Sequence, residues 1–180
     1  MVTTQDVIAA IERLSGHPLN RDEGVHHGRA DRPISRGLVC WMATPDALRA
    51  AAQHQCDLVI AHESLYYPYD AIVRADNPPG WQDWPTNRQR RELLERYDLV
   101  LLRAHGSADD ICIFDDFAAL LDLGEPVSAD GLAKIYEIPP HTVGQLVAEV
   151  KRRTGMPAVR VAAPCGMEQV VRRVGLPWGG

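Results

Sequence analysis

Apolar residues recur at helical spacing in several segments of the chain. In the first of these, Thr4–Leu14, they line one face, and Gly16 follows as a natural C-terminal stop. Thr44 followed by Pro45 offers an N-cap with proline at the first helical position, so a helix is expected directly afterwards. The helices that this spacing predicts are Thr4–Leu14, 46–56, Asn87–Tyr97 and Phe114–Leu123.

Short, continuous apolar runs alternate with these helices and predict buried strands. The runs are Gly37–Ala43, Asp57–Ala61 and Asp98–Ala104. An order of strand, helix, strand, helix, strand is typical of a parallel sheet with right-handed crossovers. The preceding segment, Leu19–Ser35, holds glycines, a proline and many charges without periodicity, so a surface loop is expected there.

The last third of the chain predicts further strands around one helix. Residues 132–138 form a strand candidate, which the double proline at 139–140 is expected to end. Thr142 and Gln145 have the spacing of a capping box, and apolar residues line one face of the helix that follows. The later strands that the pattern predicts are 158–163 and 169–176.

A length of 180 residues with 46% hydrophobic content favours a single domain, residues 1–180, with its own core. The net charge of -5 has the wrong sign for a general binder of nucleic acids or anionic membranes. No apolar run approaches the roughly 20 residues that span a bilayer, and the N-terminus has no signal-peptide core. The four cysteines form no Cys-x-x-Cys pair, so reduced thiols and a cytoplasmic protein are expected.

Polar side chains suited to metal binding follow two of the predicted strands. His62 and Glu63 come directly after the second strand, while His105 follows the third, with Asp109 four residues further on. Because the carboxyl ends of parallel strands meet at one edge of a sheet, these side chains are expected to converge. Imidazole nitrogen and carboxylate oxygen suit zinc, manganese, iron or nickel. The sequence therefore predicts a site for one or two divalent ions that would activate water for hydrolysis.

Other roles for such residues stand beside metal binding. A histidine at a strand end is more often a hydrogen-bonding loop residue than a ligand, and Asp109 and Asp110 could cap the helix around Phe114. Two matching pairs at the ends of successive strands favour the metal site over this alternative. His26 and His27 lie in the expected loop and are interpreted as solvated. Asp110 could serve as a free carboxylate that moves protons.

Three short motifs occur in a characteristic order along the chain. They are DEGV at 22–25, HES at 62–64 and HGSAD at 105–109. A tail follows, with YEIPPHTVGQLVAEVKRRTGMPAVRVAAP at 136–164 and VVRRVGLPWGG at 170–180. In this order the motifs resemble the Nif-three-like dinuclear-metal hexameric family, also called the GTP cyclohydrolase type-two-like family. The likeness covers nearly the whole chain.

The resemblance implies an α/β fold in layers, with a mixed, largely parallel sheet flanked by helices. It also implies a divalent transition metal bound by His62, Glu63, His105 and Asp109. Glu63 stands where the family has a second histidine, which alters the charge and metal preference of the site. The family's final ligand pair, a histidine and a glutamate, is expected beyond the glycine turn at which this chain ends. We therefore expect at most one well-occupied ion.

The resemblance further implies an activity and an assembly. The expected activity is metal-dependent hydrolysis of a small, nucleotide-like substrate, and the expected assembly is a toroidal homo-hexamer with its metal sites facing a central cavity. The alternative is a non-catalytic metal-binding or scaffold oligomer with a degenerate site. A nucleic-acid-binding module is disfavoured by the charge.

Aromatic residues are dense in the polar, proline-rich segment after the second strand. Beside the predicted site they could stack a planar base such as a purine. Tyrosine and tryptophan are also enriched in the cores of subunit interfaces, and this is the interpretation that we favour for an oligomer. The residues concerned are Tyr66, Tyr67, Tyr69, Trp81 and Trp84.

Overall fold

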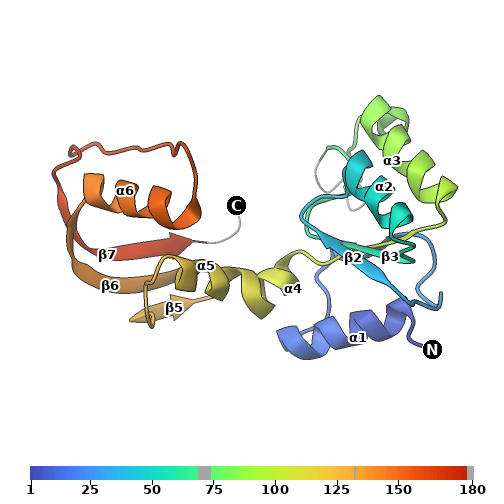
Figure 1. Ribbon diagram of the computed structural model, residues 1–180, viewed down its shortest axis with the longest axis horizontal. Coiled ribbons are helices and arrows are strands. Elements are labelled where there is room, and N and C mark those ends of the chain that lie inside the picture. The colour runs from blue at the N-terminus through green and yellow to red at the C-terminus, as the bar shows by residue number, and fades with distance from the viewer. Residues whose placement is uncertain (69–73, 132, 178–180) are drawn as a thin grey trace. The chain divides into compact units, whose positions relative to one another are not determined.

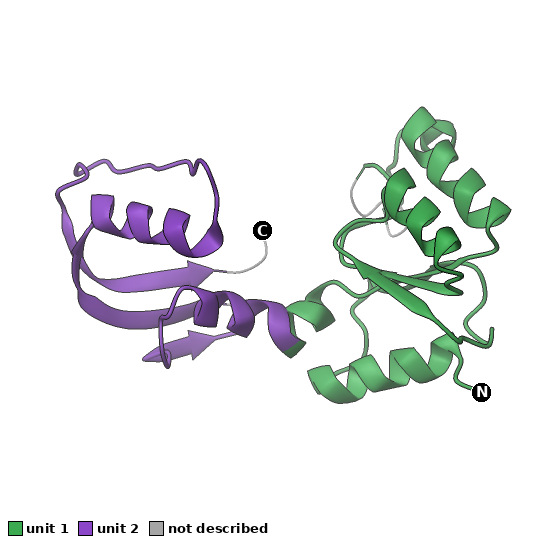
Figure 2. Ribbon diagram, in the orientation of Figure 1, with its two compact units in different colours: residues 1–111 green, residues 112–180 purple. Residues whose placement is uncertain are grey.

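The computed structural model describes residues 1–68, 74–131 and 133–177. Contacts between residues divide the chain into two compact units, residues 1–111 (unit 1) and residues 112–180 (unit 2), which Figure 2 distinguishes by colour. The elements of unit 1 are α1 (Thr4–Ser15), β1 (Gly24–His27), β2 (Gly37–Cys40), α2 (Pro45–Gln53), β3 (Leu58–Ala61), the short helix η1 (Trp81–Asp83), α3 (Pro85–Arg96), β4 (Val100–Arg103) and α4 (Gly106–Ala108). A π-helical turn, η2 (Asp109–Ile113), follows α4.

The sheet of unit 1 has the strand order β1-β4-β3-β2 (Figure 1). The strands β2, β3 and β4 run parallel to one another, and β1 is antiparallel to β4 at one edge. The sheet is therefore mixed and largely parallel, with helices around it, which confirms the expected fold class.

Helices cover both faces of this sheet, so its central strands are almost entirely buried. Side chains alternate between the two faces along each strand. One set packs against Ile8 of α1, and the other packs against Leu48 of α2 and Leu94 of α3. The strand residues of the first set are Leu58, Val100 and Leu102, and those of the second are Val59, Ala61 and Leu101.

The capping residues read from the sequence act as predicted. The Thr44 side chain accepts a hydrogen bond from the Ala47 N–H at the start of α2. In unit 2, Thr142 and Gln145 form both hydrogen bonds of a capping box. Gly16 ends α1 in the left-handed conformation, with φ of 80°. These ends depend on local chemistry, which is why the sequence predicts them.

The loop expected at 19–35 is wrong for residues 24–27, which form β1. Val25 packs into the apolar cluster on the α1 side of the sheet, and β4 supplies the backbone partners. Gly28, at φ of +82°, then lets the chain pass close to β4, because a Cβ there would lie 3.1 Å from the Val100 Cα. A four-residue strand with a bulge is too short and irregular to show the alternation of apolar and polar residues by which strands are predicted from sequence.

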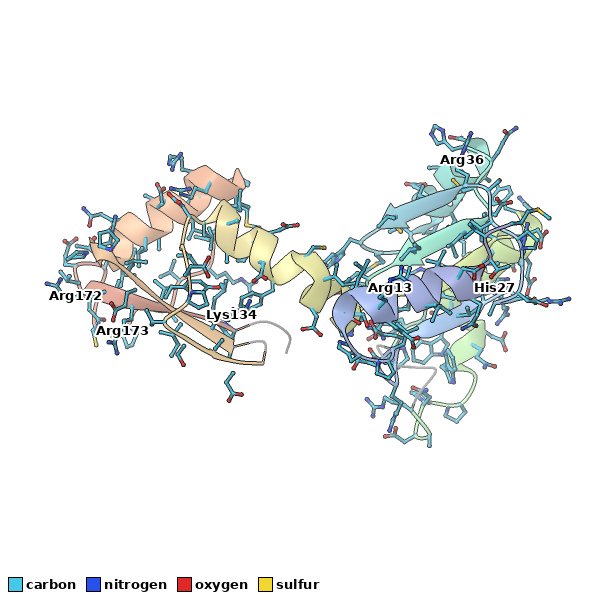
Figure 3. All side chains as sticks on the ribbon, turned by 90° about the horizontal axis from the view of Figure 1, so that it is seen from below. Arg13, His27, Arg36, Lys134, Arg172 and Arg173 are labelled. Carbon is cyan, nitrogen blue, oxygen red and sulfur yellow. The ribbon has the colours of Figure 1, made fainter. Side chains whose placement is uncertain are left out.

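Unit 2 is built on a separate antiparallel sheet with the order β5-β6-β7. Its small core joins Phe114, Ala118 and Tyr136, with Leu123 and Leu176 packed against them. Figure 3 shows the basic side chains of Arg172 and Arg173 on the last strand. The elements of unit 2 are α5 (Phe114–Leu120), β5 (Ser128–Asp130), β6 (Ala133–Thr142), α6 (Val143–Thr154) and β7 (Val170–Pro177).

Two predictions for this unit are wrong. The double proline at 139–140 does not end the strand, since β6 continues to Thr142 and accommodates the prolines at a register shift between Glu137 and His141. Residues 158–163 form no strand, because none of the strands in the part of the chain that the structure describes pairs with them. The strand expected at 169–176 is confirmed as β7.

Parts of three sequence predictions lie outside the described residues. They are Leu132 at the start of the expected strand, Tyr69 in the aromatic segment, and residues 178–180 after β7. Within the described ranges, no helix has the length and apolar character needed to cross a membrane.

Candidate metal centre

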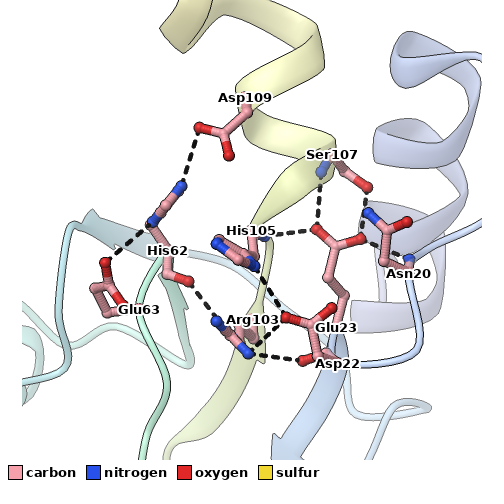
Figure 4. A network of polar contacts seen from close by, with 9 residues as sticks. All are labelled: Asn20, Asp22, Glu23, His62, Glu63, Arg103, His105, Ser107 and Asp109. Atoms are coloured by element: carbon pink, nitrogen blue, oxygen red, sulfur yellow. Dashed lines mark hydrogen bonds and ion pairs between the residues drawn. The ribbon is translucent and has the colours of Figure 1, made fainter. Parts of the chain in front are cut away.

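The candidate site lies where β3 and β4 end. His62 directly follows β3 and His105 lies two residues beyond β4, and these two strands are parallel neighbours. A short helical turn then brings Asp109 to the same place (Figure 4). One ligand atom from each of His62, His105 and Asp109 lies within 4.8 Å of the others. Topology thus brings together three of the four residues that the sequence selects.

The three side chains are close-packed and largely withdrawn from solvent. His62 Nε2 lies 3.2 Å from Asp109 Oδ1, and the rings of His62 and His105 meet edge to face with centroids 4.8 Å apart. His62 is 8% exposed and Asp109 is 3% exposed. A buried carboxylate facing two imidazoles is a donor set that a divalent transition metal can occupy.

Glu63 lies beside this group without joining it. Its Oε1 is 3.7 Å from His62 Nδ1, beyond hydrogen-bonding distance, and its side chain is partly exposed. His62 Nδ1 is buried and has no hydrogen-bond partner among the described residues. The two ring nitrogens of His62 therefore face two different carboxylates, Asp109 and Glu63.

Asp22 and Arg103 contact the histidines of the site. Neither was predicted from the sequence as a site residue. Asp22 Oδ2 lies 2.9 Å from His105 Nδ1 and 2.8 Å from Arg103 Nη1. Burial opposes the ionisation of Asp22, but the hydrogen bond from His105 and the charge of Arg103 outweigh it, so the pKa of Asp22 lies below its ordinary value. Two features of the sequence could have indicated these residues: the DEGV turn, which contains Asp22, and an arginine within the apolar run LVLLRA.

Glu23 fixes the backbone after β4. Its carboxylate accepts hydrogen bonds from the N–H groups of His105, at 2.5 Å, and Ser107, at 2.9 Å, and from the Ser107 hydroxyl, at 2.7 Å. Gly106 allows this turn to pass close to Asn20, because a Cβ at position 106 would lie 2.7 Å from Asn20 Nδ2. The turn that carries His105 is therefore held by the segment before β1.

Trp41 is a further residue of the site that the sequence did not indicate. Its ring stacks on the ring of His62, with centroids 4.0 Å apart and an interplanar angle of 12°. Trp41 is 54% exposed, so it covers one face of the histidine while remaining open to solvent itself. Trp41 lies within the predicted strand Gly37–Ala43 but directly follows β2 in the structure, and the position of its ring over His62 depends on the pairing of β2 with β3.

The remaining polar candidates lie elsewhere. Asp110 Oδ2 is 2.9 Å from His17 Nε2, and the pKa of His17 is raised by its hydrogen bonds with the Pro18 carbonyl and with Asp110. His26 and His27 are half-buried on β1, so the interpretation of both as solvated is wrong. Burial lowers the pKa of His27.

Asn87 is fully buried and forms hydrogen bonds with the backbone of Tyr67 and Trp81, which fixes these two described aromatics. Tyr66 packs edge to face on Trp81, and Tyr67 lies against Trp84. With His26, Gln82 and Arg91, Tyr66 and Trp81 line a cavity. A role of these aromatics in a subunit interface stays a prediction.

Solved structures of several proteins are similar to this chain in fold. A Bacillus cereus protein related to NIF3 matches with a TM-score of 0.75 at 15% identity, over 97% of this chain and 76% of its own. The Staphylococcus aureus hypothetical protein SA1388 matches with a TM-score of 0.74 at 13% identity, over 96% of this chain and 70% of its own. Reduced HcgD from Methanocaldococcus jannaschii matches with a TM-score of 0.59 at 18% identity, over 84% of this chain and 60% of its own.

Sequence comparison gives the family directly. No curated protein matches the chain at a significant level. The sequence pattern of the Duf34/NIF3 (NGG1p interacting factor 3) family, in contrast, matches residues 2–180, which is nearly the entire length. The chain therefore belongs to the Duf34/NIF3 family.

Proposed function

We propose that the protein is a metal-dependent hydrolase whose divalent ion is held by His62, His105 and Asp109. The observation that carries this proposal is the convergence of one ligand atom from each residue within 4.8 Å, at the ends of two parallel strands and on the helical turn that follows the second. Sites built on such elements hold their geometry without ordering on binding.

The chemistry of the surrounding residues fits a cation. Four carboxylates, from Asp22, Glu23, Glu63 and Asp109, gather in this network against one guanidinium, from Arg103 (Figure 4). The buried Nδ1 of His62 has no hydrogen-bond partner in the described part of the chain, and an imidazole in that state is costly unless an ion or another group engages the ring. Two imidazoles and one carboxylate favour zinc, manganese, iron or nickel over calcium or magnesium.

Each residue of the site would have a separate role in the reaction. A divalent ion, when bound, supplies Lewis acidity and makes water a stronger nucleophile at neutral pH. His62, His105 and Asp109 would hold it, and Trp41 would keep solvent from one face of His62. Glu63 is proposed either as a fourth ligand or as the carboxylate that holds a proton beside His62 Nδ1, 3.7 Å away.

The substrate and the assembly are proposed from the resemblance to the family. We propose a small, nucleotide-like substrate and a homo-oligomer, a hexamer by that resemblance. A second candidate function is a metal-binding scaffold without turnover. The separation of Glu63 from the three-residue group favours this second candidate, since the remaining ligands suffice for one ion, whereas the family that the chain resembles is dinuclear.

Metal loading followed by an activity screen tests the proposal. Protein stripped with a chelator is titrated with zinc, manganese, iron(II) and nickel, and the bound ions are counted by elemental analysis. We expect about one ion per chain, and hydrolysis of at least one substrate from a nucleotide panel by the loaded protein alone. Loading without turnover would favour the scaffold, and the absence of binding by all four ions would contradict both functions.

A further inference from the structure

Arg103 is the most deeply buried charged side chain near the candidate site. It is the last residue of β4 and is 0% exposed. A guanidinium withdrawn from water is strongly destabilising unless partners satisfy its charge and its N–H groups. The identity of those partners shows what the arginine holds in place.

The partners of Arg103 connect the two histidines. Its Nε donates to the carbonyl oxygen of His62 at 3.1 Å, and its Nη1 lies 2.8 Å from Asp22 Oδ2. Nη1 also donates to the Asp22 carbonyl oxygen at 3.2 Å. One rigid, planar fork thus reaches the backbone of His62 and the carboxylate that contacts His105.

Asp22 determines which nitrogen of His105 carries the proton. The same Oδ2 that pairs with Arg103 lies 2.9 Å from His105 Nδ1. A carboxylate held by a guanidinium only accepts hydrogen bonds, so Nδ1 must donate. The lone pair of a neutral His105 is then on Nε2, which leaves this nitrogen to bind an ion.

We propose that Arg103 and Asp22 form a positioning pair that fixes His105 as an Nε2 ligand and ties its place to that of His62. The inference rests on the proposed function, because it concerns ligands of the same ion. The pair acts through the two histidines, and Arg103 adds a side-chain link between the ends of two strands that backbone hydrogen bonds already pair.

The first test reads the tautomer of His105 in metal-free protein by ¹⁵N NMR of the imidazole nitrogens. The His105 signals are assigned by their loss in His105→Gln. We expect Nδ1 to carry the proton in the unaltered protein, and Asp22→Asn to shift part of the population to the Nε2-protonated form. An Nε2-protonated wild type, or a tautomer that Asp22→Asn leaves unchanged, would overturn the proposal.

The second test measures zinc affinity by calorimetry. Outer partners of metal-binding histidines typically contribute about 10- to 100-fold in affinity, so we expect losses in that range for Asp22→Asn and Arg103→Met. Arg103→Lys keeps the charge without the fork and should lose less than Arg103→Met. The matched control is Arg90→Met, which removes a half-buried arginine that donates to the Leu65 carbonyl at 2.7 Å, and should change affinity by less than about 3-fold.

The two tests separate failure of this inference from failure of the proposed function. If the wild type binds none of zinc, manganese, iron(II) and nickel, the proposed function fails, and the tautomer measurement still decides whether Asp22 orients His105. If zinc binds and Asp22→Asn, Arg103→Lys and Arg90→Met all retain wild-type affinity, the positioning pair is contradicted. Asp22 is 22% exposed, so its isosteric replacement tests the pair even if Arg103→Met does not fold.

Discussion

The two units of the chain bury their strands in different ways. In unit 1, β3 and β4 lie at the centre of a mostly parallel sheet with helices on both faces, and β4 is buried at every position. In unit 2, β7 has only exposed and half-buried residues, and the core is formed by a few side chains around Tyr136. The candidate site belongs to the first kind of sheet.

This difference explains where the chemistry is found. A sheet covered on both faces can hold polar side chains only at its strand ends, where they withdraw from water but still reach one another. Arg103 and Asp109 are both nearly inaccessible there. An antiparallel sheet with an open face keeps its charges in solvent, as Arg173 does when it pairs with Glu137 on the surface of unit 2.

The largest expected effect of a single change concerns the core of unit 2. Tyr136 is 1% exposed, so Tyr136→Ala should lower the free energy of unfolding by about 3–5 kcal/mol, in the range of other large aromatic truncations. Hydrogen exchange measured along the chain should show protection lost in β5, β6 and β7 and kept in β3 and β4.

The matched control for this change is Ile135→Ala. Ile135 is the preceding residue of β6 and is 42% exposed, so its truncation should cost less than about 1 kcal/mol. Equal loss of protection in both units after Tyr136→Ala would show that the two units unfold together, and the contrast between them would then not extend to stability.

The next effect concerns metal binding, which we expect in unit 1 alone. His105→Ala should weaken zinc binding by at least about 100-fold, equivalent to about 2.7 kcal/mol, because it removes one of three ligands. The control is His141→Ala in unit 2, where the imidazole contacts the Pro139 carbonyl, and where affinity should not change. Calorimetry measures the zinc affinity of both variants. Equal affinity of His105→Ala and the wild type would contradict the proposed metal site.

A smaller effect distinguishes the two roles proposed for Glu63. As the carboxylate that holds a proton beside His62 Nδ1, 3.7 Å away, it should contribute about 10-fold to zinc affinity, so Glu63→Gln should lose about that much. As a fourth ligand it should contribute far more, and Glu63→Gln would then approach the loss seen with His105→Ala. The ratio of the two losses, measured under one set of conditions, decides between the roles.

The smallest effect belongs to the surface of unit 2. Hydrogen bonds from Arg152 and Arg153 lower the pKa of Glu149 from 4.5 to about 2. The stabilisation from the ionised Glu149 is therefore fully present above pH 4.5 and is lost as the pH falls through about 2. Carboxyl NMR should show this titration, and Arg152→Gln should return the pKa toward 4.5. A Glu149 that titrates near 4.5 in the wild type would show that solvent screens the contacts.

Much of the fold follows from short-range pattern. The helix ends at Thr44 and at Thr142 were predicted because the bonds that make them join residues three positions apart. The strand ends at His62 and His105 were predicted because each apolar run stops there. Parallel pairing of β3 with β4 then brings the two histidines together, and Asp109 follows within one turn.

The sequence by itself therefore determined the longer helices, the parallel strands of unit 1, the family and three residues of the candidate site. Only the tertiary structure decided the rest: the strand β1, the stacking of Trp41 on His62, and the link from Arg103 through Asp22 to His105. These features join segments as far as 83 residues apart. Their energies come from contacts that exist only once the sheet has formed, so no local pattern records them.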